Sequence, residues 1–267
     1  MKGMEKLPNV ALVAAAFSIF SANNAFADSN YYRLSLGSFM QDWSNPGLFT
    51  ANDDWSGVAS IMGYRGDDLS QMPGVDPQTV VSDSFSTVID ININQTSPDT
   101  FTTGGVTHFT LANPVVALSG STSADSPNLV LYLDLSGMEQ IEVSYLLRDI
   151  DGSADNAIQS MALQYRIGSS GDFTNLPAAF VANASSGPNL AILATPVSLT
   201  LPAAVENQSE VQLRFITTNA AGNDEWIGVD DIQVSGRSSF APVPEPSAVT
   251  SLIGGIGVLY ILRRRTR

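Results

Sequence analysis

The chain has 267 residues, no cysteine, and 26 acidic against 12 basic residues, which gives a formal net charge of −14. The lack of cysteine excludes disulfides, thiol catalysis and cysteine-ligated zinc. The negative charge argues against nucleic-acid binding, because phosphate neutralisation requires clustered lysine and arginine.

Residues 1–27 have the pattern of a secretory signal peptide. Lys2 and Lys6 precede an apolar run at residues 10–20 that is too short to cross a bilayer. Ala25 and Ala27 then supply small side chains at the cleavage positions. We therefore expect an exported protein.

Residues 28–238 are expected to form one all-β domain, and this length is ample for a single core. Apolar and polar residues alternate with a period of two, as at Ile89, Ile91 and Ile93. Further strand-like runs, separated by turn-forming residues, lie at residues 129–135, 141–147, 161–167, 197–201, 211–217 and 226–234. These runs predict an antiparallel sandwich of two sheets. The region holds 24 acidic and six basic residues, all arginine, which suits a soluble exported protein or a cation-binding one.

Three stretches of the sequence resemble parts of galactose-binding-like jelly rolls. Residues 164–168 and 171–176 are similar to the strand–hairpin–strand of that class, and residues 224–232 are similar to its closing strand. Residues 53–235 also resemble a domain found in large bacterial surface proteins and beside extracellular nucleases. The resemblance implies a jelly-roll sandwich, with the nuclease chemistry in a separate domain that is absent here.

A calcium site is one reading of an aspartate-rich turn. Asp149, Asp151, Ser153 and Asp155 place oxygen atoms at alternate positions around a glycine. Ca²⁺ prefers six to eight such hard ligands. The other reading is a solvated turn, in which carboxylates accept hydrogen bonds from the local backbone. The candidate ligands are Asp149, Asp151, Asp155 and Asp230.

Asp230 stands beside Asp231 in an expected strand, so the two side chains should point to opposite faces. A carboxylate that faces inward requires a partner. Arg148, Arg166, Arg214 or a cation could supply it.

No catalytic signature is visible. Glycoside hydrolysis needs two carboxylates that face each other across a sugar, and the adjacent pairs Asp53–Asp54 and Asp67–Asp68 cannot converge in that way. A Ser-His-Asp triad would have to use His108, the sole histidine, and the sequence has no Gly-x-Ser-x-Gly. We expect no enzymatic activity; the alternative is a secreted hydrolase of an extracellular polymer.

Aromatic side chains offer a route to polysaccharide binding, since their faces can stack on sugar rings. The alternative is that they pack in the core. The candidates are Trp43, Trp55, Trp226, Tyr31, Tyr32 and Tyr64.

The C-terminal segment has three features in order. Residues 239–247 form a linker that contains Pro244, Glu245 and Pro246, residues 248–262 are apolar, and residues 263–267 are arginine-rich. A 15-residue helix spans about 22 Å, short of the ~30 Å hydrocarbon core, but snorkelling arginines would let it cross. The arginines mark the cytoplasmic end.

This segment resembles the PEP-CTERM sorting signal through Pro244, Glu245, Pro246 and the arginines Arg263, Arg264 and Arg265. The resemblance implies an exosortase-type processing enzyme that cuts near the Pro-Glu-Pro motif. The helix would hold the protein in the inner membrane transiently, before release to the cell surface or an exopolysaccharide matrix. A permanently anchored protein is the alternative.

Overall fold

The computed structural model describes residues 31–70, 72–82, 88–155 and 157–239. The predicted signal peptide, the Pro-Glu-Pro motif, the apolar run 248–262 and the arginine cluster lie outside the described residues. Within the described ranges, we find no helix with the length and apolar character needed to span a membrane.

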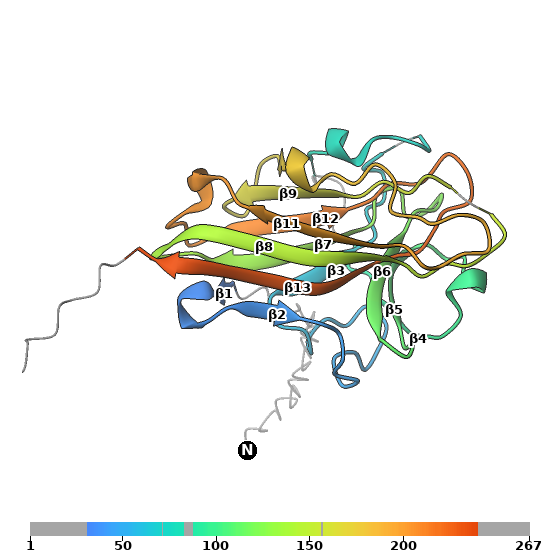
Figure 1. The fold of residues 1–267 in the computed structure, drawn as a ribbon, viewed down its shortest axis with the longest axis horizontal. Coiled ribbons are helices and arrows are strands. Elements are labelled where there is room, and N and C mark those ends of the chain that lie inside the picture. The colour runs from blue at the N-terminus through green and yellow to red at the C-terminus, as the bar shows by residue number, and fades with distance from the viewer. Residues whose placement is uncertain (1–30, 71, 83–87, 156, 240–267) are drawn as a thin grey trace, which may run out of the picture.

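The described chain forms two β-sheets packed as a sandwich (Figure 1). The first sheet has six strands. Five of them follow the order β1 (Tyr32–Arg33), β7 (Asn128–Asp134), β12 (Val211–Ile216), β9 (Ala162–Ile167) and β10 (Thr174–Asn175), and β3 (Ile61–Tyr64) also pairs with β7.

The second sheet has seven strands. Its order is β11 (Ala194–Thr200), β8 (Met138–Asp149), β13 (Ile227–Ser238), β6 (Val115–Ser119), β5 (Gly105–Phe109) and β4 (Asn92–Gln95), and β2 (Phe39–Gln41) also pairs with β13. Short 3₁₀ turns lie at Leu34–Leu36, Pro77–Thr79, Pro98–Thr100, Pro177–Ala179 and Ala203–Val205.

The predicted two-sheet, all-β sandwich is confirmed, but the expectation of purely antiparallel pairing is wrong. β1 pairs with β7 in parallel, and β4 pairs with β5 in parallel. Parallel neighbours require a crossover rather than a tight hairpin. The chain between β4 and β5 makes this crossover through the turn Pro98–Thr100.

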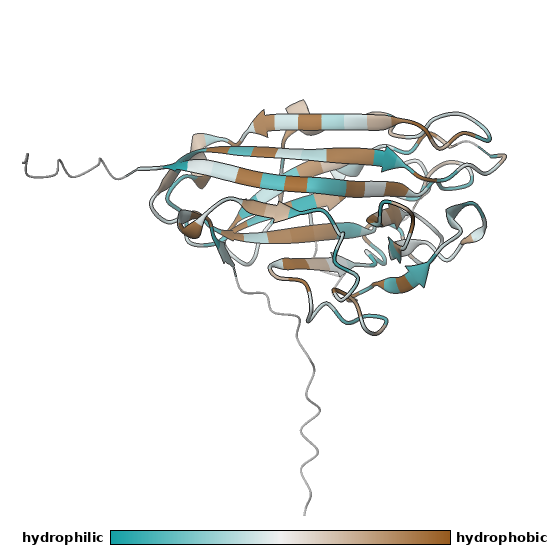
Figure 2. Cartoon of the chain, turned by 60° about the horizontal axis from the view of Figure 1, so that its bottom comes forward, coloured by the Kyte–Doolittle hydropathy of each residue, from teal (hydrophilic) through white to brown (hydrophobic). Residues whose placement is uncertain are grey.

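Alternating burial shows how β8 of the second sheet packs against the first sheet. Ile141, Val143, Tyr145 and Leu147 are buried, and the residues between them are at least partly exposed. The Tyr145 ring meets Phe215 of the opposite sheet edge-on, with centroids 4.9 Å apart. Figure 2 shows the resulting bands of apolar and polar residues along the long strands.

The outer face of the first sheet is also covered, which explains the nearly continuous apolar sequence of β7. The side chains of Arg166 from β9 and Arg214 from β12 are buried there, on the same face of this strand pair. Their guanidinium carbons lie 4.2 and 4.0 Å from the centroid of the Phe173 ring. Arg214 Nη1 also donates to Ser82 O at 3.2 Å, which ties the loop 72–82 to this face.

The long strands β8 and β13 define the two ends of the sandwich. β8 ends at Asp149 where β13 begins at Ile227, and β13 ends at Ser238 beside Met138, the start of β8. A 12-residue strand is about 40 Å long. The loops that follow β8 and precede β13 therefore lie at the end of the sandwich opposite to Ser238 (Figure 1). We call this end the loop pole.

Candidate functional site

The loop pole contains a hollow of about 430 Å³. Four segments of the chain form it: residues 98–102, 119–122, 151–155 and 219–226. The lining residues are Pro98, Asp99, Phe101, Thr102, Ser119, Gly120, Ser121, Thr122, Asp151, Ser153, Asp155, Asn219, Gly222, Asn223, Asp224 and Trp226. The hollow therefore brings carboxylate, amide, hydroxyl and aromatic groups together.

Two aromatic residues form one wall of the hollow. Trp226 is 1% exposed, whereas Phe101 is partly exposed and packs against it. Their ring centroids are 5.7 Å apart, and Trp226 Nε1 donates a hydrogen bond to Phe101 O at 2.6 Å. Phe109 backs both rings, with its centroid 5.1 Å from that of Trp226. Phe101 is therefore the partly exposed aromatic residue of the lining, and Trp226 holds it in place.

Sequence reasoning missed Phe101. It lies in the irregular connection between β4 and β5, where no periodicity marks it. The sequence feature that could have pointed to Phe101 is the turn Pro98–Thr100 directly before it. A proline at the start of a turn restricts the backbone, and this sets the path of the chain at the residue that follows.

Another part of the lining is acidic and is organised by hydrogen bonds. Asp99 Oδ1 accepts from Gly152 N at 2.9 Å, which joins residues 98–102 to the turn after β8. Asp151 Oδ1 accepts from Ser153 N at 3.0 Å, and Ser153 Oγ donates to Asp155. Burial raises the pKa of Asp151, and the nearby carboxylates of Asp99 and Asp155 add to that shift.

Asp224 joins two of the segments that line the hollow, residues 119–122 and 219–226. Its Oδ1 accepts from Ala220 N at 2.7 Å, and the Gly120 N–H also donates to its carboxylate. Burial raises the pKa of Asp224 to about 6. A methyl group at Gly120 would overlap both Asp224 Oδ1 and Asn219 Cα. Only glycine lets residues 119–122 approach residues 219–224 this closely.

The predicted metal ligands do not assemble into one group. Asp149 Oδ1 accepts from Asp151 N at 3.1 Å, and its other oxygen accepts from Ser186 N. Asp151 and Asp155 hold Ser153 in the same turn. These contacts are those of a turn whose carboxylates accept local backbone groups. Among the residues that the structure describes, no three acidic or histidine side chains are arranged to hold a metal ion.

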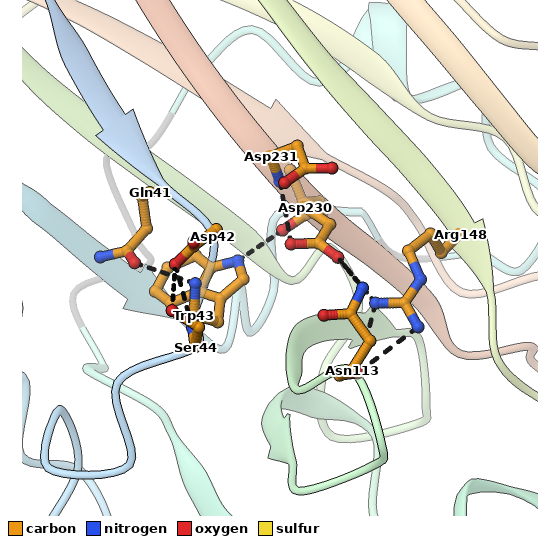
Figure 3. Close-up of polar contacts among 9 residues, drawn as sticks. Gln41, Asp42, Trp43, Ser44, Asn113, Arg148, Asp230 and Asp231 are labelled. Atoms are coloured by element: carbon orange, nitrogen blue, oxygen red, sulfur yellow. Dashed lines mark hydrogen bonds and ion pairs between the residues drawn. The ribbon is translucent and has the colours of Figure 1, made fainter.

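Asp230, the fourth predicted ligand, has partners outside that turn. Its Oδ2 pairs with Arg148 Nη1 at 2.7 Å and accepts from Asn113 Nδ2 at 3.2 Å (Figure 3). Asp230 is 1% exposed, whereas Asp231 is exposed at a bulge in β13. The structure thus buries Asp230 and exposes Asp231, and Arg148 is the partner that the buried carboxylate requires.

Glu225 is a further buried acid that sequence reasoning did not single out. It is 2% exposed, and its Oε1 accepts from Ala157 N at 3.1 Å. Burial raises its pKa to about 7, with a smaller contribution from Asp151, Asp149 and Asp155. Its main chain is held by Gln159 Oε1, which accepts from Glu225 N at 3.3 Å.

The adjacent acid pairs take part in contacts away from the hollow. Asp53 Oδ1 accepts from Ile91 N at 3.2 Å, and Asp54 Oδ1 accepts from Ser56 N at 2.9 Å. Asp67 pairs with Arg65, and Asp68 N donates to Asp125. None of these four aspartates lines the hollow.

His108 is a core residue. It is 3% exposed, its ring lies 4.9 Å from that of Phe49, and neither ring nitrogen has a hydrogen-bond partner. Burial lowers its pKa.

The three tryptophans pack in the interior, as the core-packing alternative predicted. Trp43 Nε1 donates to Val229 O at 2.7 Å, and Trp55 Nε1 donates to Asp90 O at 3.0 Å. The tyrosines Tyr31, Tyr32 and Tyr64 are partly buried, and none of them lines the hollow.

The sequence matches no protein-family model and no curated protein. Solved structures that are similar in fold include the K2 cleaved adhesin domain of Lys-gingipain, at 14% identity and a TM-score of 0.38, with 75% of this chain and 98% of that chain covered. A non-crystalline cellulose specific carbohydrate-binding module, CBM28, matches at 12% identity and 0.36, covering 54% and 98%. TmCBM61 in complex with β-1,4-galactotriose matches at 14% identity and 0.30, covering 47% and 72%. TM-scores this low carry no functional argument.

Proposed function

We propose that this chain is a non-enzymatic, exported β-sandwich that binds polysaccharide through the hollow at the loop pole. We further propose that an exosortase-type system delivers it to the cell surface or the exopolysaccharide matrix. The binding proposal and the sorting proposal rest on different parts of the chain and are tested separately.

The single observation that carries the binding proposal is the chemistry around Phe101. A sugar ring presents an apolar C–H face and a rim of hydroxyl groups. Phe101 supplies a supported aromatic surface for such a face. The carboxylates, amides and hydroxyls of the hollow supply directional partners for the rim.

The non-enzymatic part of the proposal is supported by the roles of the lining carboxylates. Asp99 and Asp224 join neighbouring loops, and Asp151 organises its own turn. A second candidate function, hydrolysis, is favoured by Glu225, since a pKa of about 7 suits a general acid. However, Glu225 is 2% exposed and does not line the hollow.

Affinity electrophoresis in polysaccharide gels tests binding, and size-exclusion chromatography of the recovered polymer tests hydrolysis. We expect retardation with unchanged polymer length. Phe101→Leu should reduce retardation, whereas Tyr165→Leu, which alters a partly buried aromatic outside the hollow, should not. Shortened polymer would favour the hydrolase, and no retardation in any gel would contradict the binding proposal.

Mass spectrometry of the surface form tests the sorting proposal. We expect a C-terminus near Pro244–Pro246. A surface form that retains Arg267 would instead indicate a permanent anchor.

A further inference from the structure

The hollow has a one-sided charge distribution, which bears on the class of polysaccharide it accepts. Four carboxylates line it, those of Asp99, Asp151, Asp155 and Asp224, and the lining contains no lysine, arginine or histidine. The described part of the chain contains no lysine at all, so arginine is its only permanently cationic residue.

The arginine nearest in sequence to the hollow does not offset this charge. Arg148 precedes the aspartate turn by one residue, but its guanidinium pairs with Asp230 at 2.7 Å and contacts Asn113 O at 3.4 Å. Neither of these partners lines the hollow.

A bound anion would feel all four carboxylates. They line one hollow of about 430 Å³, so an anion bound inside it would lie within roughly the 8 Å screening length of each of them at physiological salt. Asp224 is held inside the wall by the N–H groups of Ala220 and Gly120 and cannot turn away.

We infer that the hollow selects glycans without acidic groups and rejects those that carry uronate or sulfate. This inference rests on the proposed function and deepens it. Hydroxyl groups can donate hydrogen bonds to carboxylates, whereas a second carboxylate cannot and is repelled. The carboxylates therefore act as specificity-determining groups rather than as reacting groups.

Paired polymers that differ in charge test the inference. The probes are dextran against carboxymethyl-dextran, and galactan against polygalacturonate, each titrated in 10 mM and 500 mM NaCl with a chelator present. We expect tighter binding of the neutral member in 10 mM NaCl. Salt should strengthen binding of the acidic member and leave binding of the neutral member nearly unchanged.

A charge-matched pair of variants locates the effect. Asp99→Asn with Asp155→Asn should raise affinity for the acidic polymer about five-fold at low salt. Asp172→Asn with Glu210→Gln removes the same net charge from exposed positions outside the hollow and should not change it. Acidic polymers that bind as well as neutral ones, or equal effects of the two double variants, would overturn the inference while leaving the proposed function intact. Failure of every polymer to bind would overturn the proposed function itself.

Discussion

The indole N–H of Trp226 donates to the carbonyl oxygen of Phe101 at 2.6 Å, across 125 residues of sequence. This bond and the 5.7 Å ring contact fix an otherwise irregular connection to the first residue before β13. The accessible aromatic of the hollow is thus held by a residue of the core.

Trp226→Phe should preserve most of the ring packing but remove this hydrogen bond. We expect a loss of about 1 kcal/mol in the free energy of unfolding, because a mostly buried carbonyl loses its partner. We also expect weaker polysaccharide binding. Trp43→Phe is the matched control, since it removes a comparable bond to Val229 O, and neither Trp43 nor Val229 lines the hollow. Equal effects of both variants on binding would contradict the assigned role of Trp226.

Gly120→Ala should push residues 119–122 away from residues 219–224, which line the same hollow. Its methyl group would overlap Asn219 Cα and Asp224 Oδ1, and such overpacking costs about 1–3 kcal/mol. Gly222 lines the same hollow, but a methyl there would come no closer than 3.7 Å to Ala157 Cβ, so Gly222→Ala is the control. Thermal unfolding and binding should both distinguish the two variants.

Glu225 should make the protein less stable as pH rises towards neutrality. Its pKa is raised to about 7, above the ordinary 4.5, so the folded state retains a proton that the unfolded state releases. This contribution is complete below pH 4.5 and is lost as pH rises through about 7. In Glu225→Gln, the decline in stability between these pH values should be smaller. Urea unfolding at pH 4.5, 6.0 and 7.5 measures it, and an unchanged slope would refute the assignment.

His108 should make the protein less stable as pH falls below 6.5. Burial lowers its pKa from 6.5, so below that pH the unfolded state binds a proton that the folded state resists. Stability from this residue is therefore complete above pH 6.5 and declines as pH falls. His108→Leu should flatten the acid slope and add about 1 kcal/mol, because both buried ring nitrogens lack partners. A destabilised variant at pH 7 would show that the imidazole makes a contact the structure does not contain.

Removal of divalent cations should leave the domain unchanged. Asp149, Asp151 and Asp155 are engaged with the N–H or hydroxyl groups of Asp151, Ser186 and Ser153. We therefore expect the same melting temperature with and without a chelator, measured by differential scanning fluorimetry. A decrease that added Ca²⁺ reverses would establish the calcium site instead.

Strands with apolar alternation or a long apolar run could be located from the sequence. β7, β8, β9, β11, β12 and β13 all fall on expected runs. The short strands β1, β2 and β3 could not, because two to four residues are too few to show a period and these strands are defined by their pairing with β7 and β13. β5 and β6 are completely buried, and periodicity does not reveal a strand that is covered on both faces.

The sequence by itself determined the all-β class and the positions of the long strands along the chain, since these follow from apolar runs and from the two-residue period of a strand. The predicted export and sorting signals are likewise local patterns, read without reference to the fold. Only the tertiary structure decided that Arg148 pairs with Asp230, that the tryptophans are interior, and that residues near 100, 120, 152 and 224 share one hollow. The physical reason is that these contacts join segments far apart in the chain, and strand pairing sets which segments meet.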